Sequence, residues 1–215
     1  MSYLGSLMSN PHVGTPLPDN GGKQEDAVIV KGVYDYFHYN CDGFNDVGWG
    51  CGYRTLQTIC SWILRSQNKE YSQSSVPSIP EIQKILVDIG DKPENFYCSR
   101  EWIGSIEVGY VLNKFNVDFR ILHVTGNCDW APQLGKLSQH FQEGGCPVMM
   151  GGKTDAAAKC VIGTYKDDHL LILDPHLTGR ASMTRKLISW HSTKDFPTGL
   201  DNFYNLCIPL LQWQS

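Results

Sequence analysis

Apolar residues recur at intervals of three and four along residues 51–65, a spacing that predicts an amphipathic helix. Polar residues such as Arg54 and Gln57 fall between them. The apolar positions are Leu56, Ile59, Cys60, Ile63 and Leu64. We therefore expect a helix that begins at Cys51 and turns one apolar side towards the core.

Capping signals and shorter apolar repeats predict three further helices. Ser78 and Glu81 have the spacing of a capping box, which marks the start of one of them. Another is expected over residues 101–114, with Ser99 as its cap, and a third over residues 133–142. Helices therefore dominate the first half of the chain.

Alternating or continuous apolar runs predict strands, most of them in the second half. These runs cover residues 28–33, 117–121, 147–150, 159–165, 169–174 and 203–210. Residues 177–200, rich in Thr and Ser, are interpreted as a variable segment before the last strand. Helices followed by strands favour an α+β domain.

The first 25 residues combine Gly, Pro and polar side chains, so we predict a flexible leader over residues 1–25 and one domain over residues 26–215. Acidic residues outnumber basic ones by 22 to 18, and basic residues form no run, which argues against nucleic acid as a partner. No apolar stretch is long enough for a membrane span, and the N-terminus does not read as a signal peptide.

The eight cysteines contain no C-x-x-C pair, so we predict neither a zinc site nor another cofactor. A disulfide framework is not expected from this spacing either. These features favour a cytoplasmic, reducing compartment, in which a thiolate can persist, and a chain that acts as a monomer.

Cys51 is the first candidate for chemistry. It follows a glycine-rich run, Gly48-Trp49-Gly50, at the predicted start of the helix. Backbone N–H groups and the positive end of the helix dipole favour a thiolate there and can receive an oxyanion. The alternative is a buried structural cysteine in a tight turn.

Asp174-Pro175-His176 ends the apolar run of residues 169–174 and supplies the second candidate. Side chains two apart on a strand share a face, so Asp174 could orient His176 as a base for the thiol. The alternative is a simple turn after a strand.

These two segments and several others match a known family in order and spacing. The matching stretches are 34–43, 48–62, 90–93, 99–104, 147–152, 173–176 and 203–207. Together they resemble the ubiquitin-fold-modifier-specific cysteine proteases (the UfSP family) over about residues 33 to 210. The leader at 34–43, with no long domain expected before it, resembles the shorter of the two family members.

The resemblance implies a papain-like fold with the nucleophile helix packed against a mostly antiparallel sheet. It implies Cys51 as nucleophile, His176 as general base, Asp174 as the residue that orients it, and Tyr39 as a donor to the oxyanion. The implied partner is the ubiquitin-fold modifier, as a precursor or a conjugate on a lysine, cleaved after its C-terminal glycine.

Three residues are expected to line the substrate groove, namely Trp49, Gly50 and Trp102. Glycines beside the thiol suggest a narrow cleft that prefers a tail without side chains. Without the resemblance, Tyr39 reads as a core or rim residue, and Trp102 as a packing residue at a helix start.

Three other functions remain open at this level. An autophagy-type cysteine protease, which processes a different ubiquitin-like protein, shares the Gly-Trp-Gly-Cys and Asp-Pro-His motifs. A binding module without activity would require a lost catalytic residue. A general papain-like peptidase would cleave unfolded peptides as well as a folded modifier.

Overall fold

The computed structural model describes most of the chain, and the statements below concern that part. The described residues are 7–19, 22–67, 70–126, 130–178, 187–199 and 201–213. Parts of the predicted leader, and of the Thr- and Ser-rich segment, lie outside these ranges.

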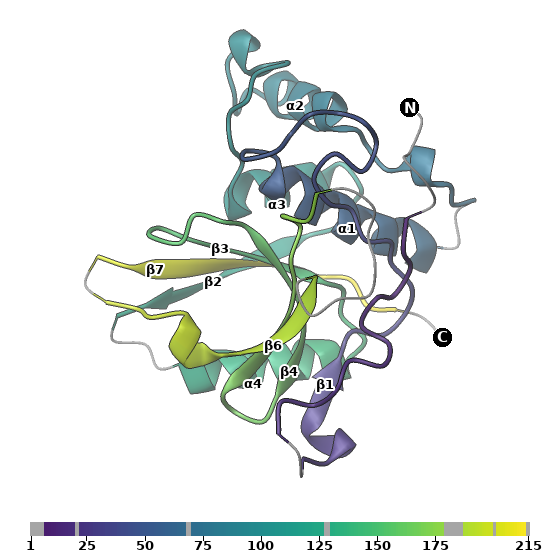
Figure 1. The fold of residues 1–215 in the computed structure, drawn as a ribbon. Coiled ribbons are helices and arrows are strands. Elements are labelled where there is room, and N and C mark those ends of the chain that lie inside the picture. The colour runs from purple at the N-terminus through teal and green to yellow at the C-terminus, as the bar shows by residue number, and fades with distance from the viewer. Residues whose placement is uncertain are drawn as a thin grey trace.

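Seven antiparallel strands form one sheet, which dominates the second half of the chain (Figure 1). Its order is β2-β7-β3-β4-β5-β6, with β1 also paired to β4. The strands are β1 (Ala27–Ile29), β2 (Phe119–Thr125), β3 (Val148–Gly152), β4 (Lys159–Tyr165), β5 (His169–Leu173), β6 (Ile188–Ser192) and β7 (Phe203–Pro209). Because β3, β4 and β5 are almost fully buried, their continuous apolar runs are those of a core sheet.

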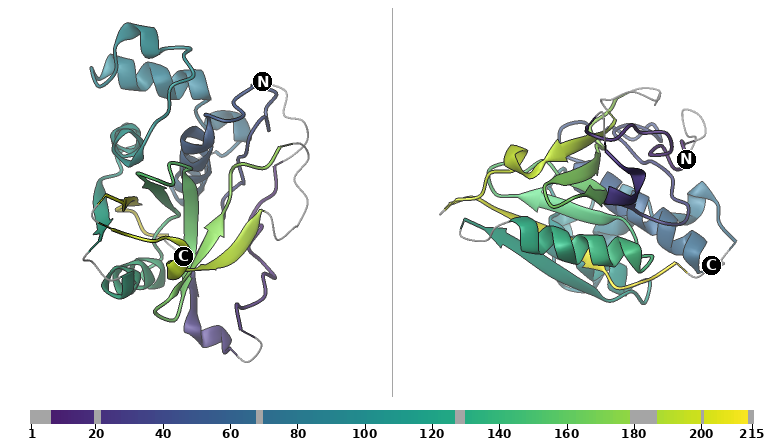
Figure 2. Two further views of the ribbon diagram at one scale, coloured as in Figure 1. Left: turned by 60° about the vertical axis from the view of Figure 1, so that its left-hand side comes forward. Right: turned by 90° about the horizontal axis from the view of Figure 1, so that it is seen from below.

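Three of the four α-helices lie together on one side of the sheet, and the fourth lies apart from them (Figures 1 and 2). The helices are α1 (Cys51–Ser66), α2 (Ile79–Asp88), α3 (Ser105–Asn113) and α4 (Trp130–Gln142). Helices α1 and α3 both pack on the sheet, α1 against β3 and β4 and α3 against β2, β3 and β7, whereas α2 contacts α3. Single 3-10 turns occupy residues Gln24–Asp26, Gln73–Ser75, Glu94–Phe96 and Thr193–Asp195.

The α+β class and the antiparallel sheet are confirmed, and several element boundaries are corrected. The helix predicted from residue 101 begins at Ser105, because Glu107 reaches back to accept the Gly104 N–H at 2.9 Å. Ser99 instead accepts the N–H of Glu101, a local turn that caps no helix. Trp102 therefore lies before α3 rather than on it.

Two strand predictions also differ from the structure. Strand β1 ends at Ile29, and Gly32 follows with φ +86° against the ring of Trp213, a conformation that ends an extended strand. Strand β6 lies in the segment interpreted as variable, where its alternation is weak because Ser189, Trp190 and His191 are all half-buried. Pairing with the buried β5 stabilises it.

The described part of the leader lies against the domain. Ser9 Oγ donates to the Asp35 carboxylate at 2.5 Å, and Asn10 N–H donates to the Tyr34 carbonyl at 3.0 Å. The predicted division near residue 25 stays a prediction. Among the described residues, no helix is long and apolar enough to cross a membrane.

Candidate active site

Cys51 is the first residue of α1, as the sequence predicts, and Gly50 is the N-cap. The Cys51 side chain is buried. No described side chain caps this end of the helix, so the N–H groups of the first turn remain available to a ligand.

The polar side of α1 is buried as well, which the apolar stripe alone does not predict. Thr58 Oγ1 accepts the Phe37 N–H at 3.1 Å, and Ser61 Oγ accepts the Asp35 N–H at 2.9 Å. Residues 34–46 thus cover this side of the helix with their backbone groups satisfied. The nucleophile helix is held on all sides.

Backbone conformation and close packing within the protein explain the glycines around Cys51. Gly48 has φ +86°, which favours glycine. A Cβ on Gly50 would lie 2.1 Å from Asp46 Oδ2, and one on Gly52 would lie 2.6 Å from the Ile103 carbonyl oxygen. Close packing therefore explains Gly50 and Gly52, and a role of Gly50 in substrate binding stays a prediction.

Asp174 and His176 meet through a turn rather than through strand alternation, because β5 ends at Leu173. One carboxylate oxygen, Asp174 Oδ1, accepts both the His176 backbone N–H at 2.9 Å and the Nδ1–H at 2.5 Å. The Asp174 N–H donates to the Leu187 carbonyl, and the Asp174 carbonyl accepts the Tyr36 hydroxyl. The turn fixes the imidazole with Nδ1 on the carboxylate and leaves Nε2 for the thiol.

Electrostatics favour an ion pair between Cys51 and His176. Burial opposes ionisation of Cys51, but hydrogen bonds from His176, the Ala158 backbone N–H and Tyr39 outweigh it and lower the pKa of the thiol. Burial would lower the pKa of His176, yet its bonds to Asp174 and Cys51 raise it to about 9. Near neutral pH the imidazole therefore carries a proton, and the thiol beside it ionises more easily than a free cysteine does.

The carboxylate is ionised in this arrangement. Burial would raise the pKa of Asp174, but hydrogen bonds from the His176 side chain and backbone hold the pKa below its usual value. The negative carboxylate in turn stabilises the positive imidazole. Asp174 thus hydrogen-bonds His176, and the imidazole of His176 in turn affects the ionisation of Cys51.

Tyr39 lies beside this line. Its ring meets the His176 ring edge-on, with centroids 5.2 Å apart, and its hydroxyl lies close enough to Cys51 to help lower the pKa of the thiol. Burial raises the pKa of Tyr39, so the phenol is a neutral donor. The phenol and the first-turn N–H groups of α1 flank the same sulfur.

A groove of about 250 Å³ runs from Cys51 between the segment before α3 and the ends of β3 and β7. Trp49 and Trp102 line it, as predicted, together with Gly151 and Gly152 of β3. Trp102 is 59% exposed, so it stands at the rim. Two larger hollows, of about 430 and 530 Å³, lie elsewhere and do not contain Cys51.

The other histidines have other partners in the structure. His38, a possible alternative base, is buried and donates from Nδ1 to the Tyr39 and Leu177 carbonyls. His169 bonds to the neighbouring Asp168 side chain. Of these three, only His176 affects the pKa of the Cys51 thiol.

Sequence reasoning missed two parts of the site. Arg54 is fully buried and bound to Asp42 and Asp46, although the pattern places it on the polar side of the helix. Ala158, whose N–H reaches Cys51, precedes β4 in a run of three alanines. A buried arginine has no periodic signal, but two aspartates just before a helix that carries an arginine are a usable hint.

Comparison with known proteins places this geometry in a family. The sequence profile described as peptidase family C78 matches residues 25–207. "Ufm1-specific protease 2" of Mus musculus is 42% identical over 217 residues, covering 96% of this chain and 45% of the relative. "Probable Ufm1-specific protease 1" of Drosophila melanogaster is 40% identical and is covered over 89% of its length, with 97% of this chain matched.

The chain thus spans less than half the length of several relatives that it matches. Identities to the two groups are similar, so the assignment to the shorter member stays a prediction. The "Crystal structure of UfSP from C.elegans" matches with a TM-score of 0.75 and 32% identity, over 97% of this chain and 38% of that one.

This structural likeness confirms the papain-like α+β fold, in which a helix that starts with the cysteine packs against an antiparallel sheet. The profile spans both the Cys51 segment and the Asp174-Pro175-His176 turn. The chain belongs to peptidase family C78.

Proposed function

We propose that this chain is a thiol protease that cleaves after the C-terminal glycine of the ubiquitin-fold modifier. It would mature the modifier precursor, remove the modifier from target lysines, or do both. The observation that carries the proposal is the arrangement at the end of a narrow groove, where Asp174 hydrogen-bonds His176 and His176 lies close enough to Cys51 to lower the pKa of its thiol. The names of the similar proteins supply the substrate class.

The proposed reaction begins with attack of the Cys51 thiolate on the glycine carbonyl. The Cys51 N–H and the Tyr39 hydroxyl would hold the oxyanion, while His176 gives its proton to the leaving amine. His176 then takes a proton from water, and the resulting hydroxide releases the acyl group as a carboxylate. Asp174 keeps the imidazole oriented and charged throughout.

The groove supports a tail with small side chains. Gly104, Gly151 and Gly152 line it beside Ala156 and Ala158, so its walls are short. Trp49, Gly50 and Trp102 keep their proposed place around the tail, with Trp102 at the rim. A folded modifier cannot enter a groove of about 250 Å³, so the globular part would remain outside.

Gly151 offers a direct test of the groove. A Cβ at this position would meet no atom within 4 Å, so Gly151→Val should fold normally while narrowing the space for the tail. We expect KM for the modifier to rise, with the reactivity of Cys51 towards a small alkylator unchanged. Equal KM values would place the tail elsewhere.

The substrate class is tested with a modifier that carries a C-terminal electrophile, followed by mass mapping of the adduct. The expected adduct is on Cys51, with none in Cys51→Ser. The matched control is a ubiquitin-like protein of the class that becomes conjugated to lipids, carrying the same electrophile. Equal labelling of Cys51 by this control would favour the autophagy-type protease. An adduct on the exposed Cys98 would contradict the assignment of Cys51.

A further inference from the structure

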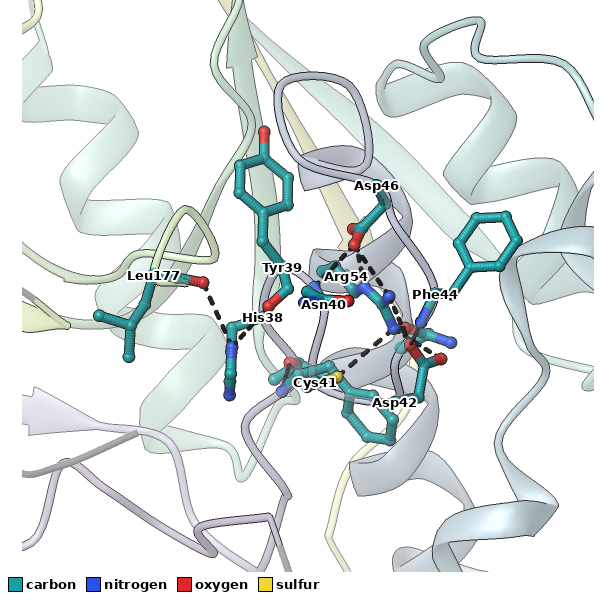
Figure 3. Close-up of polar contacts among 12 residues, drawn as sticks. His38, Tyr39, Asn40, Cys41, Asp42, Phe44, Asp46, Arg54 and Leu177 are labelled. Atoms are coloured by element: carbon teal, nitrogen blue, oxygen red, sulfur yellow. Dashed lines mark hydrogen bonds and ion pairs between the residues drawn. The ribbon is translucent and has the colours of Figure 1, made fainter. Parts of the chain in front are cut away.

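The backbone at Tyr39 and Asn40 is held from two sides, and Figure 3 shows the side of Asp46. Its own N–H donates to the Pro175 carbonyl at 3.0 Å, inside the turn that carries His176. The next N–H, of Asn40, donates to Asp46 Oδ1 at 2.7 Å. Tyr39 therefore bridges the turn of the base and the segment that leads to the nucleophile.

Asp46 joins this bridge to the start of α1. Its carbonyl accepts the Trp49 N–H at 3.1 Å and the Gly50 N–H at 2.8 Å, immediately before Cys51. The Asp46 side chain is fully buried. Residue 50 must be glycine because a Cβ there would overlap the Asp46 carboxylate. One residue thus contacts both Tyr39's neighbour and the N-cap of the nucleophile helix.

Arg54 fixes the Asp46 carboxylate from within α1. Its Nε donates to Asp46 Oδ2 at 2.8 Å and one terminal nitrogen donates to Oδ1 at 3.0 Å, a bidentate pair with fixed geometry. The same guanidinium binds Asp42 through two further bonds, of 2.8 and 3.0 Å. Asp42, however, reaches the Phe44 N–H and not the neighbour of Tyr39.

We propose that Asp46, held by Arg54, is a positioning residue that sets the Tyr39 hydroxyl against the Cys51 thiol. The inference rests on the proposed function, in which both groups face one oxyanion. Donors to an oxyanion must be held within about 0.5 Å of the productive position, a tolerance that a loop keeps only when its backbone is anchored. Asp46 provides that anchor on one side and Pro175 on the other.

The test compares Asp46→Asn with its matched control, Asp42→Asn. Each change removes one negative charge from the Arg54 pair, but only Asp46 contacts the backbone next to Tyr39. We expect Asp46→Asn to lower kcat roughly tenfold, a part of what one oxyanion donor contributes, with KM almost unchanged. Asp42→Asn should lower kcat less than about twofold at a similar melting temperature.

Two further readouts separate positioning from general damage. If Asp46 acts through Tyr39, then Asp46→Asn should cost almost nothing in a Tyr39→Phe background, because the hydroxyl that it positions is already absent. Alkylation of Cys51 by iodoacetamide forms no oxyanion, so its rate should fall much less than kcat, by no more than the small effect of Tyr39 on the pKa of the thiol. Both measurements use purified full chains and the same preparation of modifier.

Gly50→Ala keeps the inference testable if Asp46→Asn fails to fold. Its Cβ would displace the Asp46 carboxylate while every charge remains, so it should give the same pattern of kcat loss and normal alkylation. The inference is overturned if losses are additive with Tyr39→Phe, if Asp42→Asn costs as much, if alkylation falls in parallel, or if neither variant folds. A wild-type chain without turnover would instead refute the proposed function itself.

Discussion

The helix start that carries Cys51 and the strands that lead to His176 are stabilised by different physics. Around the first turns of α1, the buried Arg54 binds two buried aspartates, and backbone N–H groups bind polar helix side chains. Strands β4 and β5 are instead buried along nearly their whole length, mostly by apolar side chains. The two halves of the site should therefore fail in different ways.

The buried ion pairs of Arg54 with Asp42 and Asp46 need all three side chains, whereas apolar packing weakens in proportion to the atoms removed. Removing one partner of a buried pair leaves an unpaired charge, which costs far more than the pair contributes. Removing one methylene from a core costs only its share of packing. A single substitution in the ion pairs beside Cys51 should therefore destabilise the protein strongly. A single small substitution in the apolar strands that lead to His176 should destabilise it only slightly.

The largest effect is expected for the nucleophile itself. Cys51→Ser should lower kcat by roughly 10⁴-fold or more, since the thiolate is the attacking group. Cys98→Ser, at an exposed cysteine, is the matched control and should keep full activity. Hydrolysis of the modifier measures both, and a tenth of normal activity in Cys51→Ser would remove Cys51 from its role.

The base side is tested by His176→Ala and Asp174→Asn. The first should lose nearly as much turnover as Cys51→Ser and the second less, because the carboxylate orients and the imidazole transfers the proton. His176 should carry its proton up to about pH 9, so its positive charge, and with it any ion pair with the Cys51 thiolate, is lost as the pH rises through that value.

That titration can be followed by NMR of the His176 imidazole and by the pH dependence of Cys51 alkylation. Asp174→Asn removes the negative partner whose hydrogen bond raises the pKa of His176 most, so the imidazole should lose its proton at a lower pH. An unchanged titration would mean that Asp174 does not sustain the charge. Unchanged alkylation in His176→Ala would point to another base.

The contrast between the two halves is tested directly by stability. Arg54→Met leaves Asp42 and Asp46 buried without their cation and should lower the free energy of unfolding by about 3–5 kcal/mol. Ile172→Val, in the apolar strand β5, should cost only about 0.5–1.5 kcal/mol. Urea unfolding measures the free energy of unfolding of both variants. Similar losses in the two would contradict the proposed difference between the ionic and the apolar half of the site.

Tyr39, which bridges the two halves, should show a smaller loss of turnover than Cys51. Tyr39→Phe removes only the hydroxyl, so kcat should fall roughly 10²- to 10³-fold, the cost of one oxyanion donor. KM and the melting temperature should hardly change, because the ring remains packed against His176. A proportionate loss of stability would make Tyr39 a core residue instead.

The sequence could predict those parts of the site that depend on neighbours along the chain. Helix α1 and its start at Cys51 follow from apolar spacing and flanking glycines. The pairing of Asp174 with His176 was also predicted, but from strand alternation, whereas a turn brings the two side chains together. The predicted start of α3 was wrong because Ser99 was taken as its N-cap. Glu107 instead accepts the Gly104 N–H at the true start, and it is also paired with Lys92 from another segment.

What the sequence by itself determined is the set of reactive groups, the α+β class and the side of α1 that faces the core. Only the tertiary structure decided that the polar side of α1 is also buried, that Arg54 holds Asp46, and that Tyr39 stands between Cys51 and His176. Local patterns report the preferences of adjacent residues. Contacts between distant segments depend on how the whole chain closes, because each buried polar group must find its partner there.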